Sequence, residues 1–101
     1  MIKILYDRLI NNQFEKVKGE SQIDNIHLSP NDIPKKFVRF DAINESYIGR
    51  VILWESGEID LEILNIEDAK LVSFENFLLK DPERLQEVIN GFLNKMSDGK
   101  L

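Results

Sequence analysis

Few residues in this chain are of types that could do chemistry. The only histidine, His27, stands near Asp24, and Asp60 and Glu62 alternate along one segment of strand character. One histidine beside an aspartate supports neither a catalytic triad nor a zinc site without further ligands, and two carboxylates alone do not mark a divalent metal site. The glycines form no phosphate-binding loop of the GxGxxG or GxxxxGK type. We therefore predict no enzyme activity, no metal and no cofactor.

A tryptophan within a row of acids indicates a different kind of chemistry, which is protein binding. The stretch "GRVILWESGEIDLEIL", residues 49–64, has strand character on both sides of Ser56-Gly57 and so predicts a hairpin. Tryptophan is enriched at interface hot spots, and a rim of carboxylates attracts and orients a basic partner. The alternative is a solvated sheet face on which Trp54 is only a cross-strand neighbour.

The register of this hairpin determines which face Trp54 occupies. A two-residue loop at Ser56-Gly57 would bury Arg50 among apolar side chains. A three-residue loop over residues 55–57 instead puts Gly57 at the left-handed position of a type I turn with a bulge, where glycine is favoured. This second register matches apolar with apolar residues, so we predict Trp54 on the face opposite the core. The predicted pairs are Leu53 with Ile59, Val51 with Leu61, Trp54 with Glu58, Ile52 with Asp60, and Arg50 with Glu62.

The hairpin belongs to a longer run of strands. Strand character covers residues 37–43, 47–54, 58–64 and 70–76, and their short links predict an antiparallel meander. Residues 14–20 fit either a short edge strand or an extension of the first helix. Residues 21–36, with two prolines and several Asn, Asp and Ser residues, predict a surface loop with little regular structure.

Two amphipathic segments flank the sheet. Residues 2–12 and 81–96 carry apolar side chains at helical spacing, and Asp81 followed by Pro82 is typical of a helix start. Both helices can bury their apolar stripes on one face of the sheet. The fold class is therefore predicted to be α+β, a two-layer sandwich of a four- to five-stranded antiparallel meander with the N- and C-terminal helices packed on one face.

The other face of the sheet would remain open to water or to a partner. If Val38, Phe40 and Ala42 point into the core, Phe37, Arg39 and Asp41 join the side of Trp54. This face is our candidate partner-binding site. Its predicted residues are Arg39, Asp41, Arg50, Ile52, Trp54, Glu58, Asp60 and Glu62.

Length and composition limit the remaining classes. The 101 residues suit a single domain (residues 1–101), and the apolar share of 43% is ordinary for a globular protein. The amino terminus lacks the uninterrupted apolar core of a secretion signal, and cysteine is absent, so we expect a cytoplasmic protein. A net charge of -5 argues against nucleic acid or an anionic membrane as the main ligand and favours a basic protein partner.

The block "YIGRVILWESGEIDLEILNIEDAKLV", residues 47–72, resembles the TriTu group of bacterial immunity proteins, whose signature has the form GR(hydrophobic)xxWESGExDLExL. The resemblance implies an antidote made beside a polymorphic or contact-dependent toxin, which binds and neutralises that toxin domain. It implies a basic toxin, a nuclease being one alternative. No binding residues are carried over from the family.

Another class stays open beside the immunity protein. A small acidic α+β protein is also compatible with a secretion or folding chaperone, or an adaptor, that binds an extended segment of a client. Such a chaperone would form a dimer, whereas we expect an immunity protein to be a monomer when free.

Overall fold

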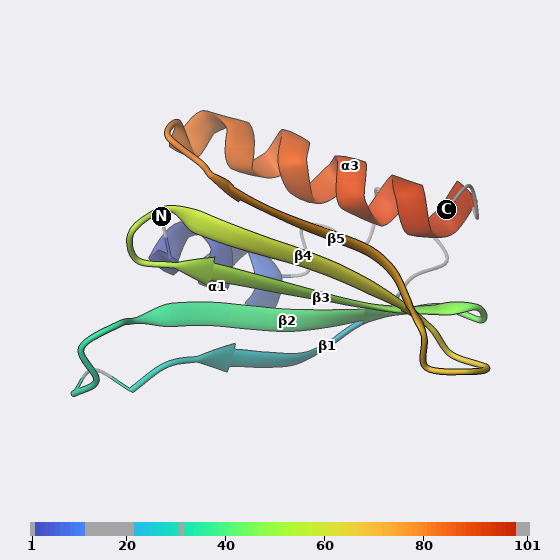
Figure 1. The fold of residues 1–101 in the computed structure, drawn as a ribbon. Helices are drawn as coiled ribbons and strands as arrows, with labels where there is room; N and C mark the ends of the chain where they lie inside the picture. Colours follow the sequence, from blue (N-terminus) through green and yellow to red (C-terminus); the bar gives the residue numbers. More distant parts are fainter. Residues whose placement is uncertain (1, 12–21, 31, 99–101) are drawn as a thin grey trace.

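An antiparallel five-stranded sheet forms the centre of the fold (Figure 1), which the computed structural model describes over residues 2–11, 22–30 and 32–98. The strands lie side by side in chain order, so the predicted meander is confirmed. Before them comes helix α1 (Ile2–Ile10), and after them a 3-10 turn, η1 (Pro82–Arg84), leads into helix α3 (Leu85–Asp98). The strands are β1 (Gln22–Leu28), β2 (Phe37–Ile43), β3 (Tyr47–Trp54), β4 (Glu58–Asn65) and β5 (Leu71–Leu78).

Strand β1 lies where the sequence predicted a loop, so that prediction was wrong for Gln22–Leu28. The two prolines of the segment stand after this strand, at positions 30 and 34. The polar residues reflect an edge strand exposed to water, and a bulge between Asp24 and His27 holds Asn25 at a positive φ of 54°. The loop prediction holds for the described residues after Leu28, whereas the ambiguous segment 14–20 lies outside the described residues.

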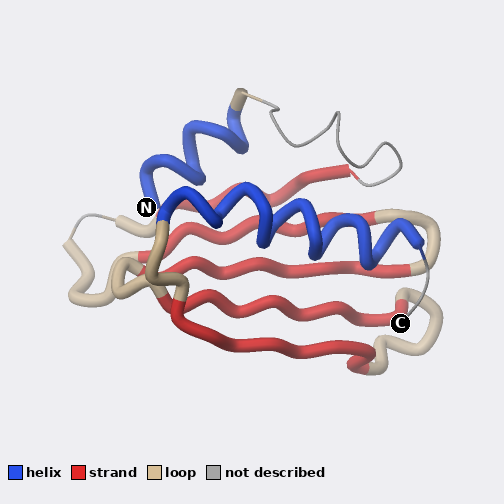
Figure 2. The backbone as a smooth tube through the Cα atoms, turned by 90° about the horizontal axis from the view of Figure 1, so that it is seen from above, coloured by secondary structure: helices blue, strands red, loops and turns tan. Residues whose placement is uncertain are grey.

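Both helices pack on one face of the sheet, as predicted (Figure 2). Every second residue of β2, β3 and β4 points into this layer, as the period of a strand requires. Fully burying each large apolar side chain contributes about 1.5 to 3 kcal/mol, which fixes the helices to the sheet. The core consists of Leu5, Val38, Phe40, Ala42, Val51, Leu53, Ile59, Leu61, Ile63, Leu79, Leu85, Ile89, Phe92, Leu93 and Met96.

The close approach of α3 to the sheet depends on Gly49. A Cβ atom added there would lie 2.5 Å from Met96 Sδ and 2.6 Å from Phe92 Cζ. Gly49 is opposite Ala42 on β2, so two small residues lie next to each other beneath the helix. The missing side chain of Gly49 lets Phe92 and Met96 fill this space and complete the core.

The C-terminal helix begins as the sequence predicted. The Asp81 carboxylate accepts a hydrogen bond from the Glu83 N–H (Oδ1 to N, 2.9 Å), and Pro82 occupies the first position. The first turn is a 3-10 turn, and the α-helical geometry begins at Leu85. Within the described residues, no helix is long and apolar enough to cross a membrane.

Candidate functional site

The hairpin between β3 and β4 adopts the register with the three-residue loop. Gly57 has a φ of 96°, and its N–H donates to the Trp54 carbonyl (2.9 Å). The predicted partners of Arg50, Val51, Ile52 and Leu53 on β4 are all confirmed. Because Leu53 is buried in the core, the neighbouring Trp54 points to the opposite side. We call this side of the sheet the open face, and the registers of β2, β3 and β4 bring all the predicted site residues onto it.

Trp54 is held in place by neighbours from three segments. The Phe37 ring, directly opposite on β2, lies 5.3 Å from the indole between centroids. Lys35 Nζ lies 4.3 Å from the centroid of the ring, within the range of a cation–π interaction. The indole N–H donates to Asp60 Oδ2 (3.3 Å). These contacts fix the orientation of a half-buried tryptophan at the surface.

The acids near Trp54 have partners of their own. Lys35 Nζ also lies 3.8 Å from Glu58 Oε2, in an ion pair whose side chains are 61% and 44% exposed. Asp60 accepts a second hydrogen bond from the Asn76 side chain on β5. Solvent screens such exposed pairs, and they contribute little to stability. Glu58 and Asp60 therefore remain accessible to a competing cation from a partner.

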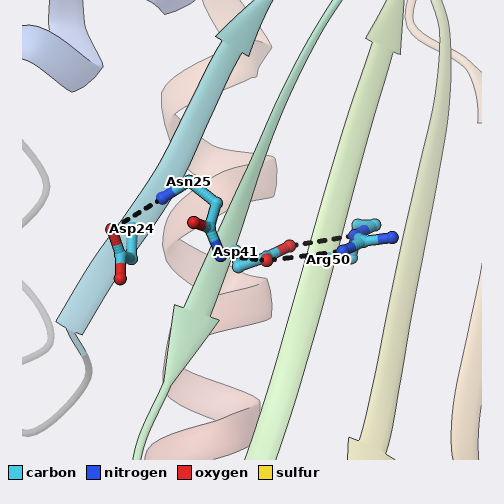
Figure 3. Close-up of polar contacts among 4 residues, drawn as sticks. All are labelled: Asp24, Asn25, Asp41 and Arg50. Carbon is cyan, nitrogen blue, oxygen red and sulfur yellow. Dashed lines mark hydrogen bonds and ion pairs between the residues drawn. The ribbon is translucent and has the colours of Figure 1, made fainter.

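Arg50 is opposite Glu62 in the register, as predicted, but its guanidinium group forms its ion pair with Asp41. Arg50 Nε donates to Asp41 Oδ1 (2.9 Å) and Nη2 donates to Oδ2 (3.4 Å), as Figure 3 shows. Arg50 lies in a central strand, opposite Glu62 on β4 and also opposite Asp41 on β2, whereas the hairpin by itself contains only the first of these neighbours. Asn25 from the β1 bulge donates a further hydrogen bond to Asp41 Oδ2 (2.8 Å).

Asp41 is the buried polar residue of the open face, with a side chain that is only 7% exposed. Burial acts to raise the pKa of its carboxyl group. Hydrogen bonds from Arg50 and Asn25, together with the charges of Arg50 and Arg39, outweigh burial and lower the pKa below its ordinary value. Asp41 is therefore ionised and enclosed, so it orders the open face rather than offering surface to a partner.

The sequence reasoning missed several residues of this face. Because β1 was predicted to be a loop, His27 was not expected here, yet its ring lies 5.8 Å from that of Phe37. Phe74 and Leu78 of β5 face the same side, opposite Glu62 and Glu58, and are 55% and 51% exposed. Phe74 and Leu78 are four residues apart in a segment of strand character, and this even spacing, which places both on one face, was a signal that could have identified them.

Two hollows in the described part of the surface differ in their relation to the polar candidates. One, of about 320 Å³ on the open face, lies beside the Asp41–Arg50 pair and Glu62, with Ile48 and Leu64 in its apolar part. The other, of about 480 Å³, lies between α1 and the ends of β1 and β3, and neither His27 nor Asp60 lines it. In the described part of the chain, no group of three or more acidic, His or Cys side chains is arranged to hold a metal ion.

A comparison with protein families identifies a match over most of the chain. The model of the family described as "Immunity protein TriTu" matches residues 8–95, which include all five strands, the end of α1 and most of α3. No curated protein matches the chain.

Proposed function

The chain belongs to the TriTu family of immunity proteins, and from this we propose that it binds and neutralises a cognate bacterial toxin domain through the open face. The toxin is a basic domain of a polymorphic or contact-dependent system. The complex forms in the cytoplasm, with the free immunity protein as a monomer. Neutralisation follows from tight binding, so the immunity protein needs no catalytic step.

The observation that carries this proposal is the fixed tryptophan on a face that the helices leave uncovered. Trp54 is already oriented by Phe37, Lys35 and Asp60 before any partner arrives. A pre-oriented side chain loses little conformational entropy on binding, and a large aromatic ring can bury much area against a partner. Trp54 is therefore the anchor expected at the centre of the interface.

Charge supports a basic partner. On the open face, Glu58, Asp60 and Glu62 follow one another along β4, while Arg50 is already paired with Asp41. The whole chain has a net charge of -5, so its long-range field also attracts a basic protein. Such complementarity raises the association rate and selects against acidic partners.

The first test is protection of cells that express the toxin domain encoded next to this chain, together with the affinity of the purified pair. We expect Trp54→Ala to weaken binding by at least about 30-fold, the size of a hot-spot loss of 2 kcal/mol. The triple variant Glu58→Gln, Asp60→Asn, Glu62→Gln should slow association and make binding less sensitive to salt.

The matched control changes the same charge elsewhere. Glu67, Glu83 and Glu87 are exposed, in the β4–β5 turn, in η1 and on α3. Their combined change to glutamine should leave the affinity within about threefold of wild type, apart from a small general effect of net charge. If Trp54→Ala and the open-face triple variant both bind and protect like wild type, the open face is not the toxin site.

A further inference from the structure

The backbone of β5 is available for pairing on its outer side. The Leu79 N–H donates to the Gly57 carbonyl (2.8 Å), so this residue directs its backbone toward β4. Hydrogen-bonded and non-hydrogen-bonded pairs alternate along an antiparallel ladder. Phe74, Asn76 and Leu78 therefore direct their N–H and C=O groups away from β4. No strand among the described residues lies on that side.

Most of β5 has little of the protection that edge strands usually carry, because its bulge lies at one end, between Leu71 and Ser73, and its inward-pointing charge, Glu75, is paired with Lys95. Its sequence, LVSFENFL, has neither lysine nor proline, and the register is regular from Ser73 to Leu78. Phe74 and Leu78, whose backbone groups point outward, are both more than half exposed. Long, regular and apolar edges of this kind pair readily with another extended chain.

The opposite edge of the sheet differs. In β1 the bulge between Asp24 and His27 interrupts the ladder, and the Asn25 N–H is used by the Asp24 carboxylate (2.8 Å). A bulge twists an edge and disrupts its pairing surface. The described part of the fold thus has one edge with a bulge in the middle of its strand, β1, and one edge that is regular from Ser73 to Leu78, β5.

We infer that β5 takes up an extended segment of the toxin domain as a sixth strand of the sheet, an inference that rests on the proposed function. Main-chain hydrogen bonds to Phe74, Asn76 and Leu78 would supply affinity, and side chains beside Phe74 and Leu78 would supply specificity. The added strand continues the open face, so the toxin contacts Trp54 and β5 with one continuous surface.

The charge of this region selects the chemistry of the segment. Asp60 and Glu62 lie on β4, next to Asn76 and Phe74, and therefore close to an added strand. A segment with apolar residues and at least one lysine or arginine on this face matches both features. A second copy of this chain fits less well, because each copy has a net charge of -5 and would bring the same acids to the joint.

The β5 edge is also held in a fixed position before binding. Lys95 on α3 donates to Ser73 Oγ (3.1 Å), and its Nζ lies 3.4 Å from Glu75 Oε1. These contacts involve the side chains that point toward the helix layer and leave the outward backbone groups untouched. An incoming strand thus meets a template that is already extended.

Amide hydrogen exchange of the isotope-labelled full chain, measured by NMR, tests the inference. In the free protein, the amides of Phe74, Asn76 and Leu78 should exchange fast, while those of Glu75 and Phe77 should be protected. Binding of the toxin domain should slow the first group by at least about 100-fold. If a tight complex forms and these three amides still exchange at the free rate, strand addition is wrong while the proposed function stands.

A pair of variants at one position separates the backbone from the side chain. Asn76→Pro removes the outward N–H, whereas Asn76→Ala retains it and removes the same amide side chain. We expect Asn76→Pro to weaken binding at least about 10-fold more than Asn76→Ala, with circular dichroism confirming that both are folded. Equal affinities of two folded variants would contradict the inference.

Two further outcomes have distinct meanings. If the wild-type chain and the toxin domain form no complex at all, the proposed function fails, and the inference fails with it. If sedimentation shows that the free protein dimerises and the amides of Phe74, Asn76 and Leu78 are protected in that dimer, a second copy occupies β5 and the inferred occupant is wrong.

Discussion

The two faces of the sheet are made by the same strands but differ in how their residues are stabilised. On the core face, Leu53, Ile59 and Phe40 are fully buried against the helices. On the open face, Ile52, Asp60 and Trp54 are partly exposed, and polar contacts hold several of their neighbours. The comparison shows that hydrophobic burial specifies one face, while particular pairs of side chains organise the other.

The difference matters for function. A face held together by apolar packing tolerates few changes, because a lost methylene group leaves a cavity. A face organised by exposed polar contacts can exchange them for contacts with a partner at small cost. The core face therefore maintains the fold, and residues of the open face can change at a smaller cost in stability.

The largest effect on stability is expected when a residue of the core face is truncated, and its neighbour on the open face provides the comparison. Leu53→Ala should lower the free energy of unfolding by about 2 to 5 kcal/mol, because it leaves a cavity beneath the helices. Ile52→Ala, one residue away on the open face, should cost less than about 1.5 kcal/mol, since its site is already in contact with water. Urea denaturation followed by tryptophan fluorescence measures both. Equal losses would contradict the division between the faces.

A smaller effect is expected from the buried carboxylate of the open face. Asp41→Asn should lower the free energy of unfolding at pH 7 by about 1.5 to 3 kcal/mol, because charge-assisted hydrogen bonds from Arg50 and Asn25 are lost or weakened. The pKa of Asp41 is lower in the folded than in the unfolded chain. The stabilisation that ionised Asp41 contributes is therefore fully present above its unfolded-state pKa, about pH 4. This stabilisation is lost as the pH falls through the lower pKa of Asp41 in the folded chain.

The pH dependence provides the check on Asp41. Wild type and Asp41→Asn are unfolded with urea at intervals between pH 7 and pH 2.5. The difference between their free energies of unfolding should stay constant down to about pH 4. It should then become smaller as Asp41 is protonated in the wild type. A difference that is unchanged at the lowest pH would show that the ionised carboxylate is not what Arg50 and Asn25 stabilise.

The smallest effect is expected at the exposed corner of the open face. Lys35→Met retains the aliphatic part of the side chain but removes the charge above Trp54. In urea denaturation at low salt, this change should lower the free energy of unfolding by about 0.5 to 1 kcal/mol. Added salt should reduce the difference, because exposed charges are screened. Lys80→Met, a change of another exposed lysine, is the matched control. A loss as large as that of Asp41→Asn would show that Lys35 has a role in the fold beyond this contact.

Much of the fold could be predicted because its signals are local. The glycine in the Ser56-Gly57 turn and the alternation around Trp54 were enough to predict the register of β3 and β4. Asp81 and Pro82 were enough to predict the start of the last helix. Strand β1 was missed because its residues are polar, and what holds them in a strand is a distant ladder with β2.

The site was predicted at the level of a face but not of its contacts. The predicted residues share the open face because side-chain alternation follows directly from the register. The partner of Arg50 was not predictable in this way, since an arginine in a central strand has a neighbour on each side. Lys35 and Asn25 come from the loop and the bulge, whose conformations have no periodic signal.

By itself, the sequence determined the α+β class, the hairpin register, the acidic charge and the resemblance to an immunity family. These properties depend on composition, local turn chemistry and periodicity, which are properties of neighbouring residues. Only the tertiary structure decided that Arg50 pairs with Asp41, that Gly49 lies beneath α3 and that β5 forms an edge of the sheet. Each of these depends on residues far apart in the chain, and folding alone brings them within contact distance.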